Sequence, residues 1–420
     1  MSIIRIDKAI IAAIIFIAAC LSARMGIPAL AEKPPLDMSL MEEFLSGRAD
    51  SGKADEAADK IQTEIQKNPT NEANYAALAF IYDYAGSYDK ALEALKSEIR
   101  YTPEKSEWGI VYGNLAREYL NLDKVDEVKK PALKSLKFNP KNINSHMNLL
   151  RCYILKGRYK EAALELKILS GLDKEMDFYY EIYVSCFDKI KNKNDIIELF
   201  RESVKVNPGN HLPHRALGTA IRDLSHDDME NNLSAIMGAF HKALELNQNY
   251  IPTYISIANT YLYLGFKTNK KAYFEDSLVW LNKAHKLDPR NLKVAYSMGN
   301  IFLAMDEYDK GIEKLEYAFQ NGANDKDTIK LLAAAYNNQA YSYYETGKNI
   351  EKGLIMIDKA ILLDPNNGLI LSTKAELLYK KKRFKEAYKY IQEAMALAPD
   401  EPGMREEFQN IEKAAKGLKQ

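Results

Sequence analysis

Apolar residues recur along this chain three and four positions apart, the spacing that places side chains on one face of an α-helix. In residues 72–103 this spacing joins Tyr75, Leu78 and Tyr82, stops at Gly86 and then resumes in a second run. Glycine after an apolar run is typical of a helix end, because it adopts the left-handed conformation without strain. The pattern therefore predicts two short helices joined by a tight turn.

This helical pair returns at a fixed distance. Pro69 and Pro103 are 34 residues apart, and so are Pro365 and Pro399. Proline blocks the continuation of a helix, so it marks the end of each pair. A period of 34 residues that ends in proline resembles the tetratricopeptide repeat (TPR). The resemblance implies a large residue at position 4 of each unit, small residues at positions 8 and 20 where the helices meet, and proline at position 32.

The register can be followed along most of the chain. We predict an all-α fold, a TPR α-solenoid in which about nine helix-turn-helix units and a C-terminal capping helix form a right-handed superhelix. Residues 37–69 are expected to form a degenerate N-terminal repeat, 72–399 the nine units, and 400–420 a capping helix and tail. The nine units are 72–103, 109–140, 143–174, 177–208, 211–248, 251–289, 292–323, 326–365 and 368–399.

Some units depart from the pattern. Pro131 falls inside the second helix of 109–140, where we expect a kink or a short helix. Extra residues at 225–232 and 266–273 are expected to lie between helices. The first helix of 326–365 is expected to be extended at its start.

The N-terminal segment has the features of an export signal. Arg5 and Lys8 precede an apolar run at 9–23, which is shorter than the roughly 20 residues that a membrane span requires. Small residues at Ala29 and Ala31 predict a signal peptide of residues 1–31.

A lipoprotein signal competes with this interpretation. Residues 17–20 resemble the bacterial lipobox, which implies a signal of residues 1–19, lipidation at Cys20 and a tether of residues 20–36. An uncleaved anchor is the third alternative. The first two outcomes place an exported, bacterial type of protein in the periplasm, outside the cell or on the outer membrane, with a lipid at the N-terminus as its membrane contact.

Charge and cysteine content narrow the classes of function. Lys+Arg and Asp+Glu both number 58, so no basic field exists that would recruit nucleic acid. Cys152 and Cys186 are 34 residues apart and occupy equivalent positions of successive units. Stacked helices lie roughly 10 Å apart, too far for a disulfide, so both are expected to be buried free thiols.

Catalytic motifs are missing from the sequence: no HExxH, GxSxG or Walker A pattern occurs, and we predict neither a catalytic residue nor a cofactor. A metal-dependent enzyme centred on His211, His214 and His226 is the last alternative considered. However, His214 falls at position 4, which is a packing position. We therefore predict no metal site.

The resemblance implies that positions 2, 5, 9, 12 and 13 of each first helix line a concave groove. Position 9 of three late units is assigned to Asn259, Asn300 and Ser342. An amide can both donate to and accept from a peptide backbone, arginine can hold a carboxylate, and tyrosine gives rigid contact area. The candidate binding residues are Arg117, Arg151, Arg222, Asn259, Tyr263, Tyr296 and Asn300.

These observations favour a non-catalytic protein–protein interaction scaffold in the cell envelope, with a protein or peptide partner in the groove. The alternative is a component of polysaccharide handling or of export machinery, with tyrosines stacking on sugars. The sequence leaves the oligomeric state open.

Overall fold

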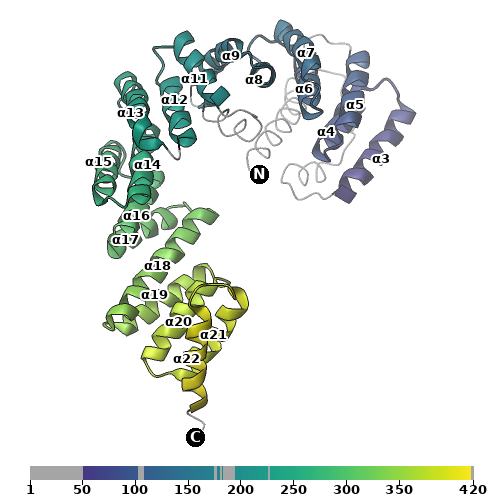
Figure 1. Cartoon of the computed structure of the whole chain (residues 1–420). Coiled ribbons are helices and arrows are strands. Elements are labelled where there is room, and N and C mark those ends of the chain that lie inside the picture. The colour runs from purple at the N-terminus through teal and green to yellow at the C-terminus, as the bar shows by residue number, and fades with distance from the viewer. Residues whose placement is uncertain are drawn as a thin grey trace. The chain divides into compact units, whose positions relative to one another are not determined.

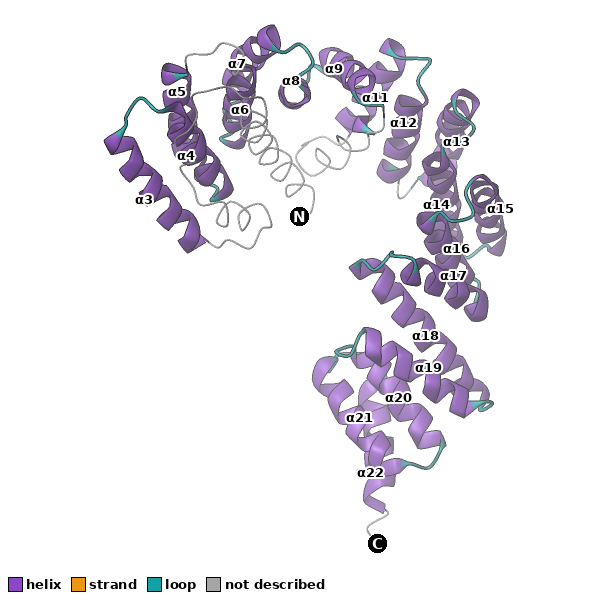
Figure 2. Ribbon diagram, turned by 180° about the vertical axis from the view of Figure 1, so that it is seen from behind, coloured by secondary structure: helices purple, strands orange, loops and turns teal. Residues whose placement is uncertain are grey.

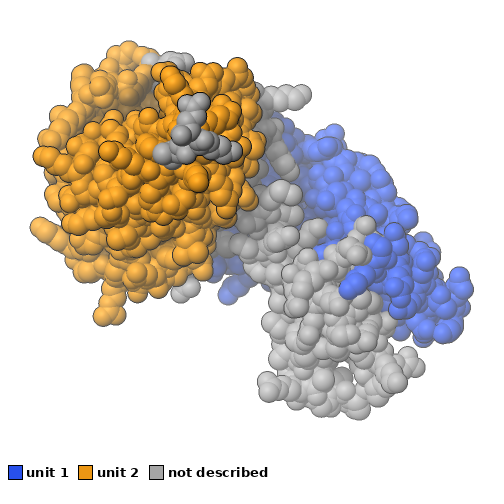
Figure 3. Space-filling model, turned by 90° about the horizontal axis from the view of Figure 1, so that it is seen from below, with its two compact units in different colours: residues 1–224 blue, residues 225–420 orange. Residues whose placement is uncertain are grey.

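The computed structural model describes residues 51–102, 108–174, 177–179, 182, 194–225 and 228–417. Over these residues the chain is helical and contains no β-strand (Figures 1 and 2). It divides into two compact units, Met1–Leu224 and Ser225–Gln420, which are coloured separately in Figure 3. The division falls inside the predicted repeat 211–248, so its two helices belong to different units. The all-α repeat architecture predicted from the sequence is confirmed.

The N-terminal unit consists of helical hairpins in sequence order. The pairs α4–α5, α6–α7 and α8–α9 pack as hairpins, and α3 packs on α4 as a single helix. Its described helices are α3 (Ser51–Lys67), α4 (Glu72–Tyr84), α5 (Tyr88–Tyr101), α6 (Trp108–Asn121), α7 (Val125–Phe138), α8 (Ile143–Leu155), α9 (Tyr159–Leu172), α11 (Asn194–Val206) and α12 (His211–Leu224).

The C-terminal unit repeats the same plan. The hairpins α14–α15, α16–α17, α18–α19 and α20–α21 stack in order, and α22 packs on α21. Its described helices are α13 (Met229–Leu246), α14 (Ile251–Thr268), α15 (Lys271–Leu287), α16 (Leu292–Ala304), α17 (Tyr308–Gln320), α18 (Lys326–Thr346), α19 (Ile350–Leu363), α20 (Gly368–Lys380), α21 (Phe384–Leu397) and α22 (Met404–Gly417).

Most of the described hairpins have a left-handed residue at position 15 of the repeat, in the turn between their two helices. Gly86, Gly157 and Gly347 have φ angles of +74°, +66° and +65°, as their positions in the sequence predict. Asp123, Asp306 and Lys382 adopt the same conformation at the equivalent position of other units. The hairpin geometry is therefore imposed by the packing of the two helices, even where the residue is not glycine.

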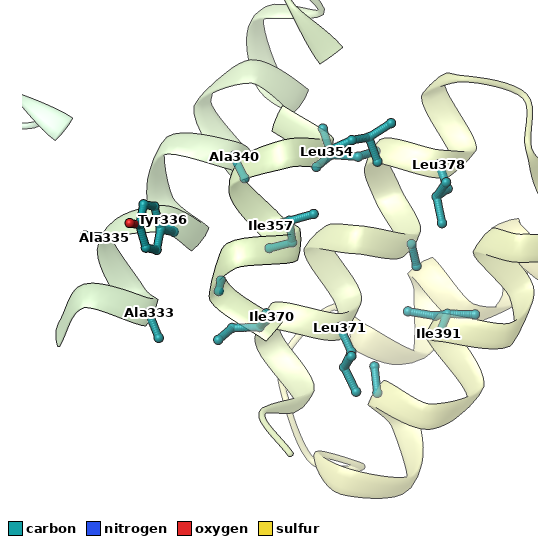
Figure 4. Close-up of a cluster of buried hydrophobic side chains, with 14 of the residues drawn as sticks. Ala333, Ala335, Tyr336, Ala340, Leu354, Ile357, Ile370, Leu371, Leu378 and Ile391 are labelled. Atoms are coloured by element: carbon teal, nitrogen blue, oxygen red, sulfur yellow. The ribbon is translucent and has the colours of Figure 1, made fainter. Parts of the chain in front are cut away.

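The core of the C-terminal unit is a continuous layer between first and second helices. In Figure 4, Ile357 of α19 lies between Ala340 of α18 and Ile370 of α20. Ala340, Ile357 and Leu378 are completely buried. Because each helix contributes small and large apolar residues to both neighbours, each repeat is stabilised by the packing inside its own hairpin and by the next repeat. Met404 and Ile411 of α22 join this cluster.

Two local expectations differ from the structure, namely the short helix at Pro131 and the extra residues between helices. The alternative of a kink at Pro131 stays a prediction. Helix α7 passes through Pro131 and has 14 residues, as many as α5, so it is not short. The missing N–H of Pro131 leaves only the carbonyl of Glu127 unpaired, and Glu127 is exposed to water.

The extra residues at 225–232 and 266–273 lie largely in helices. Helix α13 begins at Met229, α14 continues to Thr268, and α15 begins at Lys271. A left-handed Asn269 makes the short turn between the two longer helices. By contrast, the predicted extension of α18 is confirmed, because this helix has 21 residues and α16 has 13.

Candidate functional site

Two groups of candidate residues lie on the first helices of the repeats, one group in each unit. Arg117 on α6, Arg151 on α8 and Arg222 on α12 belong to the N-terminal unit. The C-terminal unit holds Asn259 and Tyr263 on α14 together with Tyr296 and Asn300 on α16. We therefore treat each group as a site of its own.

Arg117 is engaged by carboxylates of its own chain. Its Nη2 atom donates to Oε1 of Glu118 at 3.0 Å and to Oδ2 of Asp83 at 3.2 Å. Asn121 donates to the other oxygen of Glu118 at 3.2 Å. Glu118 is completely buried, and this burial, together with the nearby Asp83, raises its pKa to about 7 despite Arg117. The arginine thus compensates a buried charge inside the repeat stack.

The other two arginines are also half-buried. Nε of Arg222 donates to Oδ1 of Asp223, the next residue along, at 2.6 Å. Arg151 is half-buried on α8, which packs on α6. Asp83 and Arg117 occupy positions 12 and 9 of consecutive units, so a contact between these two positions joins one groove helix to the next.

The asparagines of the C-terminal unit differ from these arginines. Asn259 is exposed and Asn300 is half-buried, and they occupy position 9 on neighbouring helices α14 and α16, which pack on each other. Neither side-chain amide makes a hydrogen bond within the described part of the chain. Both amides can therefore donate to and accept from another molecule.

Two tyrosines flank these amides. Tyr263 and Tyr296 are half-buried. Tyr296 packs against the core of the C-terminal unit, and its pKa is raised by burial and then by the carboxylates of Asp327 and Asp325.

One groove residue was assigned wrongly from the sequence. Position 8 of the 326–365 unit is Ala340, which is completely buried, so position 9 is Tyr341 and not Ser342. The extended start of α18 shifted the count from the N-terminal side. Counting back six residues from the left-handed Gly347 gives Tyr341, as the same count from Gly86 or Asp306 gives position 9 in other units. Tyr341 is 40% exposed, and its ring centre lies 5.6 Å from that of Tyr344.

A cavity of about 340 Å³ lies at the start of α17 and beside α18. Its carboxylates already have partners within the chain: Asp306 accepts from Tyr308, Asp309 accepts from Gln339, and Glu307 pairs with Lys310. The residues that line it are Asp306, Glu307, Tyr308, Asp309, Lys310, Gln339, Ser342 and Tyr343.

Four aromatic rings at position 4, including that of His214, donate a hydrogen bond to the backbone carbonyl six residues earlier. The Nε2 atom of His214 lies 3.0 Å from the carbonyl oxygen of Pro208, six residues earlier, and donates to it. His146 makes the same bond to Pro140 at 3.0 Å. The hydroxyls of two position-4 tyrosines do likewise, Tyr75 to Pro69 at 2.9 Å and Tyr254 to Gln248 at 2.8 Å.

The hypothesis of a metal-dependent enzyme centred on His211, His214 and His226 gains no support from the residues that the structure describes. His214 bonds to a backbone carbonyl, and burial lowers the pKa of His211. His226 lies outside the described residues. Across the described ranges, no three histidine, cysteine or acidic side chains are grouped as metal ligands.

Of the three cysteines, only Cys152 lies among the described residues. Cys152 is a buried free thiol whose pKa is raised by burial, and its Sγ lies 3.4 Å from the carbonyl oxygen of Val125. Cys186 and the lipidation candidate Cys20 lie outside the described residues, as do the two predicted signal sequences. Among the helices described, none is long and apolar enough to cross a lipid bilayer.

The helical hairpins and their left-handed turns give the chain an all-α repeat fold of the tetratricopeptide type. No family model matches the chain. A TPR repeat-containing protein of Methanocaldococcus jannaschii is 21% identical over 409 residues, which cover 83% of this chain and 68% of that protein. The Hsp70-Hsp90 organising protein of Plasmodium falciparum is 27% identical over 124 residues, 30% of this chain and only 22% of that protein.

Solved structures of TPR-type proteins are also similar in part. YrrB, described as a TPR protein with an unusual peptide-binding site, is 16% identical and covers 50% of this chain and 97% of its own, with a TM-score of 0.38. MamA is 19% identical and covers 44% of this chain and 92% of its own, with a TM-score of 0.34.

Proposed function

We propose that this protein is a non-catalytic scaffold that binds an extended peptide segment of a partner protein along the first helices of its C-terminal unit. The observation that carries the proposal is the pair of side-chain amides of Asn259 and Asn300. They occupy equivalent positions on packed helices and make no hydrogen bond within the described chain. An extended peptide offers backbone donors and acceptors that such amides can satisfy.

The surroundings of the amides support the same proposal. Tyr341 continues their row onto α18 with 40% of its surface exposed, and Tyr263 and Tyr296 add half-buried rings. The cavity between α17 and α18 gives one partner side chain a place to enter. Support also comes from a relative whose name states that it organises two other proteins, Hsp70 and Hsp90.

We further propose that the scaffold acts outside the cytoplasm, in the cell envelope. The support is the sequence of residues 1–31, with the alternative of a lipid on Cys20. The mass of the mature N-terminal peptide distinguishes the outcomes. A new terminus at Glu32 indicates cleavage after Ala31, a diacylglycerol-modified Cys20 indicates a lipoprotein, and an intact Met1 in cytoplasmic fractions would refute export.

The binding proposal is tested by capture from a native extract on the immobilised mature protein. The Asn259→Ala/Asn300→Ala variant should retain at least about tenfold less of the specific partner, because each lost hydrogen bond contributes about 1 kcal/mol. Asn282→Ala is the matched control, since Asn282 is an exposed asparagine on the second helix α15. Equal retention by parent and double variant would refute the groove as the binding face.

The neighbouring rings of Tyr341 and Tyr344 favour one second candidate, a site for sugars in polysaccharide handling or export. Purified protein should then bind oligosaccharides without any partner protein, and Tyr341→Ala should abolish this binding while Asn259→Ala leaves it intact. If instead Tyr341→Ala retains peptide binding and Asn259→Ala loses it, the peptide scaffold remains the function.

A further inference from the structure

Two carboxyl groups lie on the packed helices α20 and α22, where the C-terminal helix covers the last complete repeat. Glu376 of α20 is only 8% exposed. One helical turn earlier, the hydroxyl of Ser372 donates to Oε2 of Glu407 on α22 at 2.6 Å. The side chains at 372 and 376 share one face of α20, so Glu407 lies against the same face as Glu376.

Few positive charges offset this pair. Helix α18 adds Glu345, Tyr341 and Tyr344 to its surroundings, and Lys380 of α20 is the cation near Glu376. On other faces of this region, Lys374 pairs with Asp358 of α19, and Tyr388 of α21 donates to Glu412 of α22.

Electrostatics at this contact favour a proton. Burial, and next the charge of Glu407, raise the pKa of Glu376 to about 7, against the opposing effects of Tyr344 and Lys380. The pKa of Tyr344 is raised to about 12 by burial and by Glu376, so its hydroxyl remains a donor.

We propose that a proton on the buried Glu376, on the face of helix α20 where Glu407 of helix α22 is held by Ser372, secures helix α22 on helix α20. The C-terminal helix loosens when this proton is lost. The proposal concerns a conformational switch in the fold and does not depend on whether the groove binds a peptide. Loosening uncovers Ser372 and Glu376, which extends the accessible face of the first helices by one repeat.

The direction of the switch follows from the pKa. A carboxyl whose pKa is higher in the docked state than its ordinary 4.5 takes up a proton on docking. Docking is therefore strongest below about pH 4.5 and weakens as the pH rises through about 7, above which it changes little. Met404 and Ile411 remain 2% and 3% exposed in the docked helix. Their burial keeps α22 attached on average, so the expected change is faster opening and not full release.

The test is hydrogen exchange of the full chain, measured by mass spectrometry at about pH 5 and about pH 7.5. Exchange is expressed as protection factors, which remove the intrinsic effect of pH on amide exchange, and α16 serves as the internal reference. We expect protection of α22 to fall by about tenfold or more at the higher pH relative to α16, as linkage to the raised pKa requires. An unchanged ratio between α22 and α16 would overturn the proposal.

Two isosteric variants make the test specific. Glu376→Gln should remove the fall in protection between the two pH values, because a neutral amide replaces the carboxyl group that titrates. Glu407→Gln should make the fall smaller without removing it, because burial still raises the pKa of Glu376 when the charge of Glu407 is absent. Glu406→Gln is the matched control, since Glu406 is the exposed neighbour on α22 and should leave the pH dependence intact. A Glu376→Gln protein that is helical by circular dichroism and still loosens at the higher pH would refute the role of this pair. If that variant fails to fold, a pH dependence in Glu407→Gln as large as that of the parent would refute the proposal.

Discussion

Helices α16 and α17 approach most closely at a pair of facing glycines, and this contact gives a prediction whose sign depends on the structure. A Cβ added at Gly299 would lie 2.6 Å from Cγ of Leu315 and 3.2 Å from the carbonyl oxygen of Gly311. Leu315 is completely buried and has no free space to move into. Gly299→Ala must therefore separate the two helices.

The magnitude follows from two opposing effects. Overpacking a core costs about 1–3 kcal/mol, whereas replacing glycine by alanine inside a helix contributes about 1 kcal/mol of stability. We expect Gly299→Ala to lower the stability of this hairpin by about 1 kcal/mol net. Gly238→Ala is the control, because Gly238 lies inside α13 and an added Cβ there meets nothing within 4 Å. That variant should gain about 0.5–1 kcal/mol.

The assay must resolve single hairpins, because long repeat arrays do not always unfold in one step. Hydrogen exchange of peptides from α16, α17 and α13 gives the free energy of local opening for each variant. Opposite signs for the same chemical change are the expected result. If Gly299→Ala matched or exceeded the parent in protection of α16 and α17, the close approach of these helices would be refuted.

Two further predictions concern a buried charge and a strained turn. Arg117→Ala should destabilise the N-terminal unit by about 3 kcal/mol, because the completely buried Glu118 would lose its cation. The double variant Arg117→Ala/Glu118→Gln should restore the midpoint of urea unfolding, and a midpoint that stays low would contradict this reasoning. Lys382→Gly should stabilise the last hairpin by about 1 kcal/mol, because Lys382 has a φ angle of +60°. The thermal midpoint should rise for this variant and not for Lys381→Gly, whose φ angle is −81°, and equal shifts would contradict the reasoning.

The repeat could be predicted from the sequence because its determinants are local. Proline and glycine act on the backbone of their own turn, so Pro69, Pro103 and Gly86 mark the ends of helices wherever the repeat lies. The histidine at 214 could be assigned to packing for the same reason, since position alone fixes its neighbours. The left-handed backbone could not be predicted at Asp123, Asp306 and Lys382, because it is imposed there by packing and not by the residue type.

The candidate site was predicted less completely. Placing Arg117 on the groove face required only its position in the unit, but its engagement depends on Asp83 in the previous unit, 34 residues earlier. Comparing positions 9 and 12 of neighbouring units would have found this pair. Tyr341 was missed because the added turn at the start of α18 changes the count. Whether the side-chain amides of Asn259 and Asn300 make hydrogen bonds depends on all of their neighbours in space, and the pattern of residues along the chain does not specify these neighbours.

The bonds from position-4 rings to the carbonyl six residues earlier define how this chain can be divided. Each ring belongs to one hairpin, while the carbonyl belongs to the turn that ends the preceding one. A block excised at the first residue of a helix would therefore leave the donor in one fragment and its acceptor in the other. Exchangeable modules begin instead at the proline itself, as at Pro69 or Pro208, so that recombination between repeats transfers the ring and its acceptor together.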